Sequence, residues 1–203
     1  MDTLLVSPAA AALLAIILVA SLVGLKLRPD LLEAGLFRPY WLLPRREYAT
    51  LISNAFLHAD LGHLLFNGIT FWAFAFPLER MIGSGKFLAL YFFGLLVSDA
   101  ATWLRHKHDP AYRCLGASGA ILAVLFAAIV YVPGASIFIL PIPVPIPAPL
   151  FAVLYLAYSV WASRRGRGRI NHDAHLAGAA AGIVFVAVVD TERLVGLWQY
   201  LVH

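Results

Sequence analysis

The sequence is poor in charged residues and has a single cysteine. Asp, Glu, Lys and Arg make up 13% of the 203 residues, whereas soluble domains carry about a quarter. Hydrophobic residues make up 62%, with a mean hydropathy of +0.83. This composition excludes an ordinary soluble domain. The lone Cys114 excludes an internal disulfide, so cysteine usage does not indicate a compartment.

Other features are missing as well. The net charge of +4 is spread over the segments between apolar runs, and no basic block lies beside aromatic residues, so nucleic acid is not an expected partner. The sequence has no internal repeat and no interrupted apolar run in matching halves, which argues against a small transporter.

Long apolar runs dominate what is present. We expect an all-α, polytopic membrane protein with one domain over residues 1–203, because runs of this kind cross bilayers as helices. No Lys or Arg precedes the first run, which therefore does not resemble a signal peptide. The six predicted spans are approximately 3–25, 63–81, 87–103, 118–132, 150–162 and 174–189.

The segments between the runs have distinct compositions. Residues 28–62 mix charges with aromatic residues and prolines, which is typical of a loop lying in the membrane interface. Residues 83–86 are predicted to form a tight turn. Prolines recur through 133–149, so an extended apolar connector is expected there. Residues 191–203 are expected to form a short interfacial helix.

The fourth run opens on Gly116-Ala117-Ser118-Gly119 and is short for a full bilayer crossing of about 20 residues. A helix that begins inside the protein, below the membrane surface, would resolve this. The Ser118 hydroxyl is a candidate helix cap, a small packing residue or a nucleophile. The free N–H groups of a helix N-terminus would favour an oxyanion beside it.

Histidines near the ends of two other runs are candidate partners for that serine. His175, Gly178 and Gly182 share one helical face, and the glycines would let another helix approach until His175 touches it. If that helix begins at Ser118, the serine gains a base that titrates near neutral pH. His63 and Asn67, four residues apart, also share a face.

A metal site is the competing interpretation of the histidines. Its candidate ligands are His58, His63, His172, Asp173 and His175. The sequence has no His-Glu-x-x-His motif, which supplies ligands and a general base together. A metal site would also leave the Gly-Ala-Ser-Gly turn unexplained, so no metal or other cofactor is predicted.

Taken in order, these motifs resemble those of the rhomboid intramembrane serine proteases. The resemblance covers about residues 45–190. It implies a six-helix bundle in which Ser118 is the nucleophile and His175 the general base. The matching residues are His58, His63 and Asn67, then Glu79 before the turn at 83–86, then Gly116 to Gly119, then His175, Gly178 and Gly182.

The resemblance also implies supporting roles. His63, Asn67 and the Ser118 N–H would form the oxyanion hole, His58 would support the first loop, and Glu79 would tie the turn after it. The sequence departs from many bacterial members at two places. Leu122 stands where they have a tyrosine that packs on the base, and Ala49-Thr50 stands where they have Trp-Arg in the first loop.

The implied function is cleavage of transmembrane protein substrates in contact with membrane lipids, in the bacterial inner (cell) membrane. A non-catalytic relative that binds membrane proteins is the alternative, but such relatives lack the dyad. Two arguments on orientation conflict. Twelve of the 15 Lys and Arg residues lie on the side of the predicted dyad, which favours a cytoplasmic site, whereas the resemblance implies an outward-facing one. Substrate identity and oligomeric state are left open.

Overall fold

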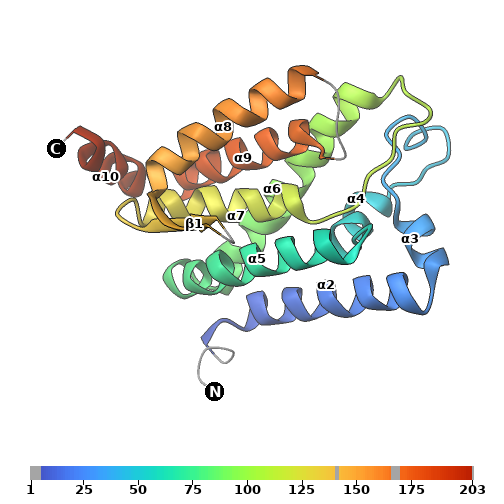
Figure 1. Cartoon of the computed structure of the whole chain (residues 1–203), viewed down its shortest axis with the longest axis horizontal. Coiled ribbons are helices and arrows are strands. Elements are labelled where there is room, and N and C mark those ends of the chain that lie inside the picture. The colour runs from blue at the N-terminus through green and yellow to red at the C-terminus, as the bar shows by residue number, and fades with distance from the viewer. Residues whose placement is uncertain (1–5, 140–141, 166–169, 203) are drawn as a thin grey trace.

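Helix α7 (Ser118–Tyr131) lies at the centre of a helical bundle in the computed structural model (Figure 1). Helices α5 (Leu61–Ile82), α6 (Ser84–His106) and α9 (His172–Val189) pack around it. Eleven of its 14 residues are buried, as expected for an all-apolar helix with other helices packed around it. Ser118 therefore begins a helix that is enclosed by protein.

The structure describes residues 6–139, 142–165 and 170–202, so positions 3–5 of the first predicted span lie outside it. Helices α2 (Pro8–Lys26), α8 (Ala148–Arg165) and α10 (Thr191–Val202) lie on the outside of the bundle (Figure 1). Among the described helices, α2, α5, α6 and α9 are long and apolar enough to cross a membrane. The predicted all-α, polytopic class is confirmed.

Helices α5, α6, α8 and α9 are longer than the predicted spans, whereas α2 and α7 are shorter. The turn predicted over 83–86 is reduced to Gly83, which alone separates α5 from α6 and takes a positive φ of 79°. Ser84 begins α6, and its hydroxyl donates a hydrogen bond to the Glu79 carboxylate at 2.6 Å. The same buried carboxylate accepts hydrogen bonds from the backbone N–H groups of Ala9 and Ala10. Glu79 thus joins the starts of α2 and α6 to the end of α5.

The long first loop is built from short elements. These are α3 (Pro29–Gly35), α4 (Thr50–Ser53) and the 3-10 turn η1 (Asn54–Phe56). The loop lies at the end of the bundle where α7 begins (Figure 1). Phe37 and Cys114 exchange two backbone hydrogen bonds of 3.0 Å. This bridge joins the first loop to the segment that leads into Ser118.

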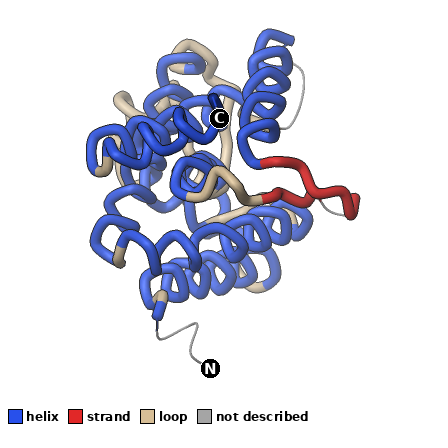
Figure 2. The backbone as a smooth tube through the Cα atoms, turned by 90° about the vertical axis from the view of Figure 1, so that its left-hand side faces the viewer, coloured by secondary structure: helices blue, strands red, loops and turns tan. Residues whose placement is uncertain are grey.

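The extended connector predicted over 133–149 contains two paired β-strands. β1 (Ser136–Ile139) pairs antiparallel with β2 (Ile142–Pro147), with Ile137 opposite Ile146. Figure 2 shows the hairpin projecting from the side of the bundle. The prolines predict an extended backbone. They do not predict strand pairing, because a proline has no backbone N–H to donate to a neighbouring strand.

Candidate active site

Ser118 and His175 face each other across the contact between α7 and α9. Ser118 Oγ lies 2.9 Å from His175 Nε2. The two helices meet backbone to backbone, because a side chain at Gly178 would overlap the carbonyl of Gly119, and one at Gly182 would overlap that of Ala123. The glycines therefore allow the approach that brings the imidazole to the hydroxyl.

The turn before Ser118 is tightly held. Gly116 has a φ of 128°, which favours glycine, and the ring of His63 occupies the space a Cβ would need. The Gly116 N–H donates a 3.0 Å hydrogen bond to the carbonyl of Asn54 in η1. The Asn54 amide in turn donates to the buried Asp99 carboxylate of α6 at 2.9 Å. Three elements thus fix the backbone that presents Ser118.

His58 is fully buried and links two helices. Its Nε2 lies 2.8 Å from the Asn67 amide nitrogen, and its Nδ1 lies 2.9 Å from Ser21 Oγ on α2. The Ser21 hydroxyl also lies 3.0 Å from the Phe56 carbonyl, to which it donates. Ser21 Oγ must therefore accept from Nδ1–H, and Nε2 must accept from Asn67. This assignment leaves the second amide hydrogen of Asn67 available to another acceptor.

Burial also fixes the charge of His58. It lowers the pKa of this imidazole to about 3, with a further contribution from the neighbouring His63 ring. His58 is thus neutral at neutral pH, as the hydrogen-bond assignment requires. His63 lies edge-on to it, with ring centroids 4.9 Å apart. The His63 side chain makes no hydrogen bond within the described part of the chain.

Tyr155 on α8 is a site residue that sequence analysis did not predict. Its hydroxyl lies 2.9 Å from His175 Nδ1, and its ring lies 25° from parallel to the imidazole. Leu122, where many relatives have tyrosine, packs in the hydrophobic cluster that Tyr155 borders. The contact joins residues 20 positions apart on two helices, and no sequence pattern links them. A tyrosine from a different helix thus contacts the candidate base.

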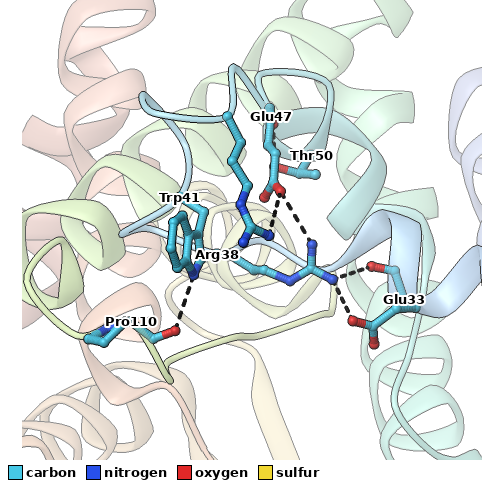
Figure 3. A network of polar contacts seen from close by, with 7 residues as sticks. Glu33, Arg38, Trp41, Glu47, Thr50 and Pro110 are labelled. Atoms are coloured by element: carbon cyan, nitrogen blue, oxygen red, sulfur yellow. Dashed lines mark hydrogen bonds and ion pairs between the residues drawn. The ribbon is translucent and has the colours of Figure 1, made fainter.

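An arginine and a tryptophan at other positions anchor the first loop, together with the hydroxyl of Thr50 (Figure 3). Arg38 bridges the carboxylates of Glu33 and Glu47, at 2.6 and 3.4 Å. Trp41 donates from its indole N–H to the carbonyl of Pro110 at 3.3 Å. Thr50 donates its hydroxyl to the Glu47 carbonyl at 2.6 Å. The loop therefore contains a tryptophan and an arginine, Trp41 and Arg38, but about ten residues before the positions where many bacterial relatives have Trp-Arg.

The other candidate metal ligands do not converge. The His172 ring contacts the edge of the His175 ring, while Asp173 accepts a hydrogen bond from Ser163. In the parts of the chain that the structure covers, no three His, Cys, Asp or Glu side chains are grouped to hold a metal ion.

Comparison with known proteins decides the family. A family model described as Rhomboid domain matches residues 45–191. The chain belongs to the rhomboid family. It is 32% identical over 149 residues to a Bacillus subtilis protein named "Putative rhomboid protease YdcA", covering 72% of this chain and 71% of the relative.

Other relatives are longer. RHOMBOID-like protein 12, mitochondrial, of Arabidopsis thaliana is 30% identical over 162 residues, or 71% of this chain and 47% of the relative. Rhomboid protease GluP of Bacillus subtilis is 27% identical over 75% of this chain and 28% of the relative. The chain thus spans about half or less of these relatives. Rhomboid membership and the apolar helices make it an integral, multi-pass membrane protein.

Proposed function

We propose that this rhomboid-family chain is an intramembrane serine protease that cleaves transmembrane helices of membrane-protein substrates. The observation that carries the proposal is the 2.9 Å contact between Ser118 Oγ and His175 Nε2. A hydroxyl is a weak nucleophile until an adjacent base removes its proton, and this contact has the length that the transfer needs. The names of the relatives YdcA and GluP support the same chemistry.

The first half of the reaction forms an acyl-enzyme. Ser118 Oγ attacks the scissile carbonyl carbon as its proton passes to His175 Nε2. Collapse of the tetrahedral intermediate breaks the C–N bond, and the imidazolium returns the proton to the leaving amine. Tyr155 Oη, which accepts from His175 Nδ1–H, would hold the ring in the tautomer whose Nε2 is free to act as base.

The second half is hydrolysis of the ester. His175 takes a proton from water, the hydroxide attacks the acyl carbon, and the Ser118 oxygen leaves and recovers the proton. In both halves the negative charge on the carbonyl oxygen needs donors. We assign these to the Ser118 N–H at the start of α7, the free amide hydrogen of Asn67 and the ring of His63. No cofactor enters this sequence.

A fluorophosphonate probe tests the proposal directly. The purified full chain in detergent is expected to become covalently labelled at Ser118, as peptide mass spectrometry would show, and to cleave a model transmembrane substrate. Ser118→Ala should abolish both the labelling and the cleavage. Ser98→Ala, at a buried serine on α6, should still be labelled at Ser118. A chain that is folded but neither labelled nor active would instead be a non-catalytic, membrane-protein-binding member of the family.

A further inference from the structure

A polar cavity of about 410 Å³ lies between the first loop and the segment before Cys114, and its lining includes none of the candidate active-site residues. Figure 3 shows four of its lining residues, Glu33, Arg38, Trp41 and Pro110. The volume of the cavity falls within the range of small-ligand sites. Its lining includes Trp41 from the first loop and the residues from Pro110 to Arg113. Both segments belong to loops at the end of the bundle where α2 and α6 finish (Figure 1).

The lining is basic. Arg38, Arg45 and Arg113 line the cavity against a single carboxylate, that of Glu33, so the lining carries a surplus of two positive charges. Arg38 is already paired with Glu33 and Glu47. Arg45 has only one long ion pair, with Glu47, and an anion is the ligand that Arg45 and Arg113 would favour.

Arg45 and Arg113 differ in how their guanidinium groups are held by neighbouring residues. The Arg45 guanidinium lies 3.8 Å from the centre of the Trp41 ring. Its ion pair with the Glu47 carboxylate is long, at 3.9 Å. Stacking on the indole holds the guanidinium plane while leaving its N–H groups for an acceptor. Arg113 makes no hydrogen bond or ion pair with any residue that the structure describes.

We propose that this cavity binds the phosphate group of an anionic phospholipid. Arginine forks match phosphate oxygens, and one phosphodiester charge suits the two available guanidinium groups. Beside Trp41, the side chains of Tyr40 and Leu43 are exposed to 37% and 55%. An aromatic and apolar margin next to cations is typical of the membrane interface, where the lipid glycerol and acyl chains would continue.

The bound headgroup would also join two segments that position Ser118. Arg113 precedes Cys114, which pairs with Phe37 beside Arg38. Three residues after Arg113, the Gly116 N–H is bonded to Asn54. A phosphate held by Arg45 and Arg113 therefore bridges the first loop to the chain entering α7. This inference concerns binding and stands whether or not the chain is a protease.

The test is a thermal-shift titration of the full chain in an uncharged detergent. Short-chain dioctanoyl-phosphatidylglycerol is the probe, with dioctanoyl-phosphatidylcholine and inorganic phosphate in parallel. Phosphatidylglycerol should raise the melting temperature saturably, and the other two should not. Arg113→Gln and Arg45→Gln should each raise its apparent Kd about tenfold, the size of one charge-assisted contact. Arg80→Gln, an exposed arginine at the other end of α5, is the matched control and should bind like wild type.

Three results would overturn the proposal. An equal response to phosphatidylcholine would mean that any lipid stabilises the fold. An equal response to inorganic phosphate at matched concentration would assign the cavity to a free anion. If Arg80→Gln weakened phosphatidylglycerol binding as much as Arg113→Gln does, the binding would depend on the net charge of the protein and not on this cavity. If one arginine variant does not fold, the other decides.

Discussion

Ser21 Oγ on α2 lies 2.9 Å from His58 Nδ1 in the loop before α5, and this contact reaches the candidate active site through one further residue. Because Ser21 is committed as donor to Phe56, it fixes the tautomer of His58. The tautomer in turn fixes which atoms of the Asn67 amide face His58. Helix α2, which lies on the outside of the bundle, thereby orients a candidate oxyanion donor.

Ser21→Ala should therefore slow catalysis through Asn67. We expect kcat to fall about 3–30-fold, less than the 10²–10³ that loss of an oxyanion donor costs. In an Asn67→Ala background the same change should have no further effect, because groups acting as a unit are not additive. Ser7→Ala is the control, since Ser7 is equally buried and also donates to a carbonyl, that of Phe76. If both serine variants lose stability and neither loses kcat, Ser21 is only structural.

Ser118→Ala and His175→Ala should each abolish cleavage of a model membrane substrate. The double variant should be no slower than either single one, since the two side chains act together. Ser118→Ala should leave the melting temperature nearly unchanged, because it removes one hydroxyl at the start of α7. Initial rates in detergent check the first expectation and thermal unfolding the second. Cleavage by Ser118→Ala at the wild-type rate would contradict a serine mechanism, and loss of activity to a chelator with recovery on zinc would indicate a metal enzyme.

Tyr155→Phe should lower kcat about 3–10-fold with little change in KM. It removes one hydrogen bond to the base, worth about 1 kcal/mol, while the ring stays against the imidazole. Tyr155→Ala should cost more, because ring packing is lost as well. Tyr158→Phe, on the same helix but 53% exposed, should behave as wild type. Unchanged kcat in Tyr155→Phe would show that the phenol does not position His175.

Stability should fall as the pH is lowered from about 7 towards 4. His58 has a pKa of about 3 in the folded protein and near 6.5 when unfolded, so the unfolded chain binds more protons between these values. His58→Gln should flatten this slope in melting temperature against pH, while His108→Gln, at an exposed loop histidine, should keep it. A wild-type slope in His58→Gln would assign the acid sensitivity to other groups.

The orientation conflict can be settled with single cysteines at two exposed positions, Gly85→Cys and His108→Cys, in a Cys114→Ser background. The loop holding position 108 lies on the side to which Ser118 opens. We expect an outward-facing site, so an impermeant thiol reagent on intact cells should label position 108 and not 85. The reverse pattern would favour the charge distribution over the family resemblance. Burial raises the pKa of the Cys114 thiol to about 12, so this cysteine is a poor competitor even when retained.

Local patterns in the sequence predict the helices and the faces that meet, but not the contacts between distant segments. His175, Gly178 and Gly182 share a face by helical periodicity, and the structure places the two glycines against α7. The partners of His58 could not be predicted in the same way. Ser21 is 37 residues away, on a helix that is apolar on every side. Its sequence therefore does not predict which face turns towards His58.

The two departures from the family pattern illustrate the same limit. Leu122 and Thr50 stand where many relatives have tyrosine and arginine, and the sequence does not say which other residues supply those contacts. Tyr155 reaches His175 only because α8 packs beside α9. The bacterial inner membrane also stays a prediction, since the relatives include mitochondrial and bacterial proteins.

The buried carboxylate of Glu79 has a consequence for how the protein is made. It accepts from the backbone N–H groups of Ala9 and Ala10, about 70 positions earlier in the chain. A ribosome completes α2 long before it adds Glu79, so the first amides of α2 lack this partner until α5 has been synthesised. The hydrogen-bonded corner of α2, α5 and α6 can therefore form only after the chain has been synthesised as far as Ser84, however early α2 itself is translated.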